Sequence, residues 1–145
     1  MAELGTSQQP IIMPTYPHFL AGDTEVWTKY LRNPVVPIKE LWYEVHVGRA
    51  VDLLAESDEI DRRIAAGVSR KRIDVVARVG NGFWIIEVKP VAGLSALGQI
   101  IIYTRLFARE FPVTGEIVPV IVSDEIDQDV LPEIDSLGIV VALND

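Results

Sequence analysis

Hydrophobic residues occur along this chain in short blocks, and their spacing alternates between that of a helix and that of a strand. Apolar positions at helical spacing predict a first helix over residues 24–32, with Asp23 as its N-cap. Alternating positions predict a strand over 41–47. Two runs rich in Val, Ile and Trp predict further strands over 72–79 and 83–89. The chain is therefore expected to begin with one helix and three strands.

Helical spacing returns after Pro90, which is expected to close the third strand because it lacks a backbone donor. Ser95 is the expected N-cap of the next helix. A short apolar strand is expected over 117–123, a helix over 130–137 and a last strand over 139–143. The predicted fold class is α/β: a mixed central sheet flanked by helices in the order αβββαβ, with one added αβ unit.

The glycine turn between the second and third strands sets their register. Asn-Gly favours a tight hairpin because both residues tolerate positive φ. With Asn81-Gly82 as the loop, Asp74 lies opposite Lys89; with Gly80-Asn81 as the loop, Asp74 lies opposite Glu87. In both registers the two acids and the lysine share one face, whereas a regular three-residue loop would separate them.

Two carboxylates, with an amine beside them, lie at the mouth of an apolar hairpin, and the carboxylates are the ligand type of a metal site. Mg²⁺ prefers carboxylate oxygens, usually takes one or two of them, and keeps water at its other positions. Lys89 beside such an ion would hold or deprotonate an attacking water. The alternative is a salt-bridged strand end in which Lys89 only neutralises Asp74 and Glu87, and these three residues do not decide between the two.

Gln99 and Tyr103 are four residues apart on the following helix and share one of its faces. A helix that follows a strand in this way packs back across the sheet, so this face would lie over the carboxylates. Read singly, Gln99 is an ordinary surface amide and Tyr103 is a core aromatic with a solvated hydroxyl.

Taken together, these residues resemble the PD-(D/E)xK, or restriction-endonuclease-like, nuclease superfamily. Its signature is an acid on one strand and (D/E)-x-K on the next, here Asp74 and then Glu87-Val88-Lys89. The spacing of Gln99 and Tyr103 is similar to the Gln-x-x-x-Tyr motif of the RecB-like branch. Ile73 stands where the Pro of the family's name would be.

The resemblance implies a metal-dependent nuclease, expected to be an endonuclease, that hydrolyses phosphodiester bonds in DNA rather than RNA. Its cofactor would be Mg²⁺ or Mn²⁺, held by carboxylates and a backbone carbonyl. The lysine would activate water, and the helix pair would orient the lysine or a phosphate. The implied metal ligands are Asp74, Glu87 and Val88, and the implied catalytic residues are Asp74, Glu87, Lys89, Gln99 and Tyr103.

Two further acids are candidates for the site. Some members of the family add an acid from the first helix, for which Glu25 is the candidate here, although a Glu in a first turn also compensates the helix dipole. On the first strand, alternation puts Trp42, Glu44 and His46 on one face and Tyr43, Val45 and Val47 on the other. These polar side chains either approach the site or lie at a solvated edge of the sheet.

The net charge of −8 is unevenly distributed. Residues 110–145 contain nine acids and no Lys or Arg, so the remaining residues carry all 13 bases and 12 acids. A nearly neutral N-terminal part permits a local basic surface. The run Arg70-Lys71-Arg72, just before Asp74, is therefore the expected nucleic-acid-binding segment, with a solvated charged face as its alternative.

Composition limits the setting in which the protein acts. The absence of cysteine excludes disulfides and thiolate metal sites, and His18 and His46 are too far apart in sequence to suggest a zinc site. No membrane segment and no secretory signal are recognised, so a cytoplasmic location is expected, or the host cytoplasm for a phage-encoded protein. One domain over 20–145 is expected after an extended arm over 1–19, which is either frayed or bridges copies of the chain.

Two other functions stay open beside the nuclease. One is a non-catalytic module of the same fold that binds nucleic acid or protein, as an oligomer or within a larger replication, repair or phage assembly. The other is an interaction protein whose acidic C-terminal half mimics DNA.

Overall fold

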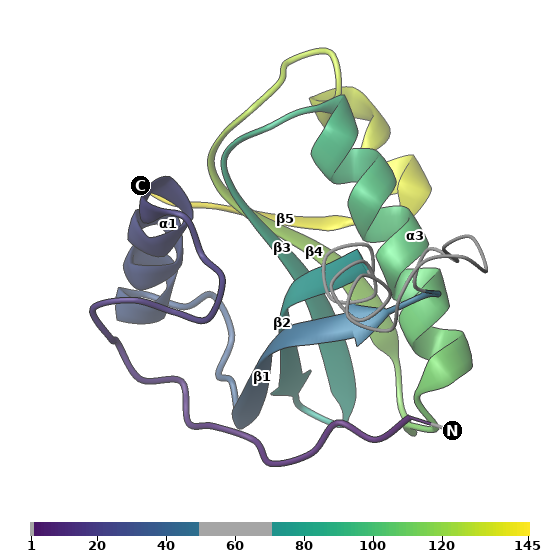
Figure 1. The fold of residues 1–145 in the computed structure, drawn as a ribbon. Helices are drawn as coiled ribbons and strands as arrows, with labels where there is room; N and C mark the ends of the chain where they lie inside the picture. Colours follow the sequence, from purple (N-terminus) through teal and green to yellow (C-terminus); the bar gives the residue numbers. More distant parts are fainter. Residues whose placement is uncertain (1, 50–70) are drawn as a thin grey trace, which may run out of the picture.

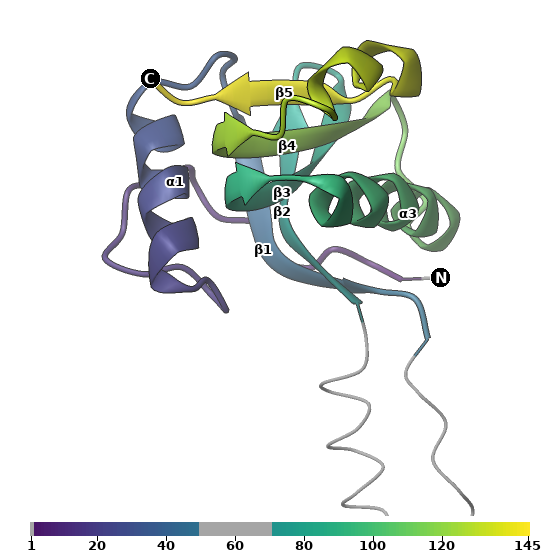
Figure 2. The same cartoon turned by 90° about the horizontal axis from the view of Figure 1, so that it is seen from above.

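A five-stranded mixed sheet lies at the centre of the structure, a computed structural model that describes residues 2–49 and 71–145 (Figures 1 and 2). The strands lie side by side in chain order, so β1 and β5 form the two edges. The first three strands pair antiparallel, and the last three pair parallel. The strands are β1 (Glu40–Val47), β2 (Lys71–Val79), β3 (Gly82–Ala92), β4 (Ile117–Ile126) and β5 (Val140–Leu143).

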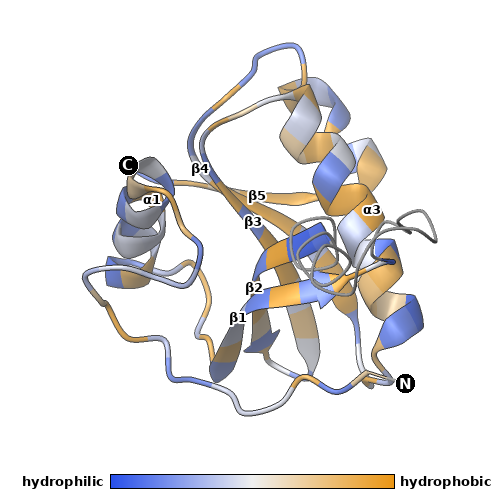
Figure 3. Cartoon of the chain, in the orientation of Figure 1, coloured by the Kyte–Doolittle hydropathy of each residue, from blue (hydrophilic) through white to orange (hydrophobic). Residues whose placement is uncertain are grey.

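One helix covers each face of the sheet, because the strands are apolar on both sides. α3 (Leu94–Glu110) shares a buried cluster with Ile85, whereas α1 (Ala21–Arg32) shares another with the next residue, Ile86. Figure 2 shows the two helices on either side of the strands, and Figure 3 shows how hydrophobic residues dominate the strands. The described residues thus form the predicted α/β structure, a mixed sheet flanked by helices. None of their helices has the length and apolar character needed to cross a membrane.

Both helices begin earlier than the sequence pattern indicated. α1 starts at Ala21, so Asp23 lies in its first turn and is not its N-cap. α3 starts at Leu94, so Ser95 is likewise inside the helix. Neither helix start has a side-chain cap hydrogen bond. A prediction based on residues that favour N-caps therefore placed both starts wrongly. Asp23 still favours α1 through its charge near the positive end of the helix dipole.

The predicted helix over 130–137 is wrong, because this segment forms two short 3-10 turns. The hydroxyl of Ser136 donates to the carbonyl of Glu133 over 2.8 Å, which competes with an α-helical hydrogen bond. The N–H of Leu137 donates instead to the carbonyl of Ile134, over 3.1 Å. The two turns are η1 (Leu131–Glu133) and η2 (Asp135–Leu137).

The third strand continues beyond Pro90, contrary to the prediction. β3 ends at Ala92 and pairs with β4 as far as Ile126. Its pairing with β2 ends at Ile86, so Pro90 lies where only β4 borders β3. A proline is tolerated in a strand segment that has a free edge.

β1 changes face at Glu44, so the predicted alternation is only partly right. Glu44 has φ 53, in the left-handed region. Leu41 and Tyr43 pack on the α1 side of the sheet, whereas Trp42 and Val45 pack on the α3 side. Trp42 and Val45 were expected on opposite faces, and the distorted backbone between them places both on the same one.

The N-terminal arm lies along the outer edge of β1 (Figure 1). Gln8 and Leu41 exchange two backbone hydrogen bonds of 2.8 and 2.9 Å, and the Trp42 indole donates to the carbonyl of Gly5 over 3.0 Å. Tyr16 is buried, with 3% of its surface exposed. The arm is therefore extended, and in this structure it packs on its own chain.

Candidate active site

The hairpin between β2 and β3 closes through the two-residue loop Gly80-Asn81. Positive φ occurs at the first loop residue only, the pattern of a type II′ turn. The pairing ends at Val75 and Ile86, and the next pair in this register is Asp74 and Glu87. Of the two registers that the sequence allowed, the structure has the one that sets the two acids opposite each other.

β2 and β3 separate beyond Val75 and Ile86, and the Asp74 side chain occupies the opening. Its Oδ2 accepts a hydrogen bond of 2.8 Å from the N–H of Val88. Because the N–H and C=O of one residue in an extended strand point to the same side, the Val88 carbonyl faces the opening as well. We call this opening the fork; residues 72–74 of β2 and 87–89 of β3 form it.

Glu87 is a buried carboxylic acid on the α3 side of the fork, with 4% of its surface exposed. Its Oε1 lies 3.9 Å from Nζ of Lys89, whose side chain is 37% exposed. Its Oε2 is buried and has no hydrogen-bond partner among the described residues. A buried oxygen without a partner is costly, and a bound cation would satisfy it.

Burial raises the pKa of both carboxyl groups. The pKa of Glu87 rises to about 9 through burial first and the charge of Asp74 second. The pKa of Asp74 rises to about 6 through burial, against the hydrogen bond from Val88. At 3.9 Å, Lys89 is too far for a hydrogen bond and offsets only part of these rises. At neutral pH, without a cation, Glu87 therefore keeps its proton and the pair carries one negative charge.

Two residues of α3 lie on the helix face above the fork. Burial raises the pKa of Tyr103. The charges of Glu87 and Asp74 raise it further and that of Arg72 lowers it, so the Tyr103 hydroxyl lies within electrostatic range of all three groups. Gln99 lies one turn earlier on the same helix face. Its Oε1 is buried and finds no hydrogen-bond partner in the described part of the chain.

The acid that α1 brings near the fork is Asp23, which was predicted only as the N-cap of the helix. Its charge raises the pKa of both fork carboxyl groups. A Cβ on Gly22 would lie 3.2 Å from Cγ of Pro90, so the start of α1 lies against β3 just beyond Lys89. Glu25, the residue proposed from the sequence, is exposed. With the helix start predicted at Ala21, Asp23 would have been recognised as a first-turn acid and therefore as a candidate for the site.

Glu44 contacts two imidazoles and the guanidinium of Arg72 rather than the carboxyl groups of the fork. Its Oε1 lies 2.7 Å from Nε2 of His18, 3.3 Å from Nε2 of His46 and 3.9 Å from Nη1 of Arg72. We call these four residues the Glu44 cluster. The two histidines, far apart in sequence, thus meet on one carboxylate oxygen, which no local pattern predicted.

The basic run before Asp74 is only partly described. Arg70 lies outside the described residues. Lys71 and Arg72 begin β2 and are exposed. Arg72 also donates a hydrogen bond of 3.0 Å from Nη1 to Nδ1 of His18.

The fork suits a small, hard divalent ion. Its oxygen ligands would be two carboxylates, one of them with a free buried oxygen, and the Val88 carbonyl. Residues 2–49 and 71–145 contain no group of three or more His, Cys, Asp or Glu placed to hold a metal. Mg²⁺ does not require such a group, because one or two carboxylates and several waters suffice, whereas Zn²⁺ prefers nitrogen and sulfur ligands.

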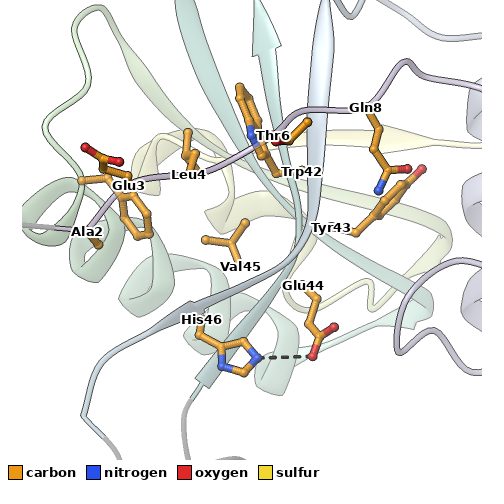
Figure 4. Close-up of a pocket in the computed structure, with 11 residues that line it drawn as sticks. Ala2, Glu3, Leu4, Thr6, Gln8, Trp42, Tyr43, Glu44, Val45 and His46 are labelled. Atoms are coloured by element: carbon orange, nitrogen blue, oxygen red, sulfur yellow. Dashed lines mark hydrogen bonds and ion pairs between the residues drawn. The ribbon is translucent and has the colours of Figure 1, made fainter.

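A cavity of about 440 Å³ lies between the N-terminal arm and β1 (Figure 4). Leu4 and Thr6 of the arm line one side of it, and Trp42 and Val45 line the other. Glu44 also lines it and is the member of the sequence-predicted site that does so. The cavity is therefore separate from the fork carboxylates.

Comparisons with known proteins add little. No protein-family model matches the chain, and no curated protein matches it. One solved structure, described as "Crystal Structure of Protein of Unknown Function AF1548", aligns with 83% of this chain and 54% of its own, at 17% identity and a TM-score of 0.44. This chain spans about half the length of that protein, and a similarity at this level carries no argument about function.

Proposed function

We propose that this protein is a metal-dependent nuclease with a restriction-endonuclease-like core, acting on DNA with Mg²⁺ or Mn²⁺. The observation that carries the proposal is the buried carboxyl of Glu87. It has a free oxygen, lies opposite Asp74, and is 3.9 Å from an amine at the solvent boundary. If the three residues only balanced charge at a strand end, the acids would lie at the surface, where an ionised carboxylate has little desolvation cost.

The residues of the fork divide the work of hydrolysis. Asp74, Glu87 and the Val88 carbonyl would hold the ion, which when bound polarises the phosphoryl group and lowers the pKa of a bound water. Lys89, whose side chain is partly exposed, would hold or deprotonate the attacking water. Tyr103 would donate a hydrogen bond to a phosphate oxygen or orient the lysine amine.

The test is cleavage of labelled DNA and RNA in Mg²⁺, in Mn²⁺ and in EDTA. We expect metal-dependent cleavage by the unmodified protein. Lys89→Ala is expected to lose about 10²–10⁴-fold in kcat, and Asp74→Asn to lose metal-dependent activity. Lys39→Ala, an exposed lysine before β1, is the charge-matched control and is expected to cleave normally. Full activity in both fork variants would remove this mechanism.

The burial of Glu87 also favours a second candidate, a non-catalytic binding module on the same fold. A carboxyl group that keeps its proton at neutral pH can serve as a neutral hydrogen-bonding core residue. In that case Mn²⁺ would leave the melting temperature unchanged, and the protein would bind nucleic acid or a protein partner without cutting. A rise in melting temperature with Mn²⁺ that is lost in Asp74→Asn would argue against this candidate.

A further inference from the structure

His18 and Glu44 are the two non-glycine residues with positive φ in the described ranges, and their side chains touch. Their φ values are 61 and 53, a backbone conformation that L side chains adopt rarely. Nε2 of His18 and Oε1 of Glu44 are 2.7 Å apart. Two uncommon backbone conformations that meet in one side-chain contact indicate that this contact is maintained for a purpose.

The contacts of His18 define its tautomer. Nη1 of Arg72 lies 3.0 Å from Nδ1 of His18, and a guanidinium can only donate. Nδ1 is therefore the acceptor, so the ring hydrogen is on Nε2 and is donated to Glu44. Glu44, His18 and Arg72 thus form a chain in which each hydrogen bond has a defined direction, and the guanidinium is fastened at one end.

The fork carries two cations, Arg72 on β2 and Lys89 on β3. Arg72 precedes Asp74 by two residues, and Lys89 follows Glu87 by two residues. Each arm of the fork therefore carries one carboxyl group and, two residues further out, one cation. A phosphate backbone that reaches the fork therefore has one cation available from each strand.

The guanidinium of Arg72 is available to a ligand. Its side chain is 40% exposed, and among the described residues its hydrogen bond is the one to His18. Its charge lowers the pKa of Tyr103, which the charges of the fork carboxylates raise, so it acts on the same hydroxyl that they do. A guanidinium has five donors in a planar fork, and the free ones match two oxygens of a phosphate.

Building on the proposed nuclease function, we propose that Arg72 binds a phosphate of the nucleic acid next to the scissile one. In this arrangement His18 and Glu44 are positioning residues, because they hold the guanidinium at the edge of the fork without contacting the substrate. The N-terminal arm, which supplies His18, is then part of the substrate-binding apparatus.

Variants of Arg72 and His18 separate binding from positioning. Arg72→Ala is expected to weaken binding of a short DNA duplex about tenfold and to lower the slope of log K against log salt by about one, the loss of one phosphate contact. KM is expected to rise more than kcat falls. His18→Ala is expected to weaken binding about threefold or more with little change in the salt slope, because the guanidinium remains but is no longer held.

His18→Asn is the rescue variant. Its amide oxygen can accept from Arg72 in place of Nδ1, and Asn tolerates positive φ. Affinity is expected to return most of the way to that of the unmodified protein. Arg32→Ala, an exposed arginine in the last turn of α1, is the charge-matched control and is expected to change neither affinity nor slope. Thermal melts of all variants check that they are folded.

Binding is measured in Ca²⁺ by fluorescence anisotropy, and cleavage in Mg²⁺ or Mn²⁺. An affinity and salt slope in Arg72→Ala equal to those of the unmodified protein would overturn the phosphate contact. Unchanged affinity in His18→Ala would overturn the positioning role. If the unmodified protein binds DNA but cuts none, the nuclease proposal fails while the Arg72 contact is still decided by these measurements. If it neither binds nor cuts, both proposals fail.

Discussion

Asp74 and Glu87 face each other across the fork closely enough for their carboxyl groups to share a hydrogen bond. Burial raises the pKa of both groups, and the charge of Asp74 raises that of Glu87 further, whereas the hydrogen bond with Glu87 lowers the pKa of Asp74. Without a cation, the pair therefore holds a proton at neutral pH. Stability and metal binding should both depend on this proton.

The metal-free protein is expected to lose stability as the pH rises from about 4.5 to about 9. The pKa of Glu87 rises from 4.5 to about 9 on folding, so between these values the folded chain keeps a proton that the unfolded chain releases. The stabilising contribution is full below about pH 4.5 and is lost as the pH rises through the folded pKa. Thermal melts in EDTA across this range measure the effect.

Glu87→Gln isolates this contribution because the amide does not titrate. Its melting temperature, relative to that of the unmodified protein, is expected to increase steadily with pH. At about pH 8 the variant should be the more stable of the two by several degrees, since 1 kcal/mol corresponds to roughly 2–4 °C in a chain of about this size. A difference that does not change with pH would contradict the raised pKa.

Mn²⁺ or Mg²⁺ binding is expected to release protons at pH 7. A carboxyl group must lose its proton to bind a metal, and Glu87 holds one at that pH. Titration calorimetry in two buffers of different ionisation enthalpy should give a release of up to about one proton per ion. At about 100 times Kd, the ion should also stabilise the fold by roughly 2.7 kcal/mol. Binding with no proton release would mean that the ion sits elsewhere.

Asp23→Asn is expected to lower the pKa of both Asp74 and Glu87, because it removes a negative charge that raises them. Carboxyl carbon NMR titrations measure these values directly. Metal affinity is expected to fall about tenfold if the Asp23 carboxylate supports the ion from outside its ligand shell. Glu25→Gln, two residues away and exposed, is the control and should leave the pKa values and metal affinity unchanged.

Gly82→Ala is expected to destabilise the fold by about 1–3 kcal/mol. A Cβ there would lie 2.4 Å from the backbone carbonyl oxygen of Glu116, and backbone cannot move aside cheaply. Gly98→Ala, inside α3 with nothing within 4 Å of the new Cβ, is expected to stabilise by about 0.5–1 kcal/mol. Urea unfolding of both variants measures the two effects, and equal changes of the same sign would contradict this packing.

Local pattern was sufficient for the centre of the sheet. Val, Ile and Trp in β2 and β3, on either side of Gly80-Asn81-Gly82, predict a hairpin, and the even loop length that the shared face required is the one observed. That was enough to bring Asp74, Glu87 and Lys89 to one opening. The exact register was not fixed by the sequence, because Gly80-Asn81 and Asn81-Gly82 are both acceptable loops.

The ends of the helices and the contacts between distant segments could not be predicted from the sequence. Neither helix start has a side-chain cap hydrogen bond, so the predictions of Asp23 and Ser95 as N-caps placed both starts too late in the sequence. The change of face at Glu44 occurs where its side chain contacts His18 from the arm. Such a contact joins segments with no periodic relation to each other, so only the tertiary structure reveals it.

The backbone bridge between Gln8 and Leu41 has a consequence for solubility. β1 is an outer strand, and an uncovered outer strand offers its amides and carbonyls to any other extended chain, which invites aggregation. By occupying part of that border, residues 5–8 shield it from intermolecular strand addition. A protein truncated before Ile11 would lose the backbone pairing of Gln8 with Leu41, together with the hydrogen bond that Gly5 accepts from Trp42.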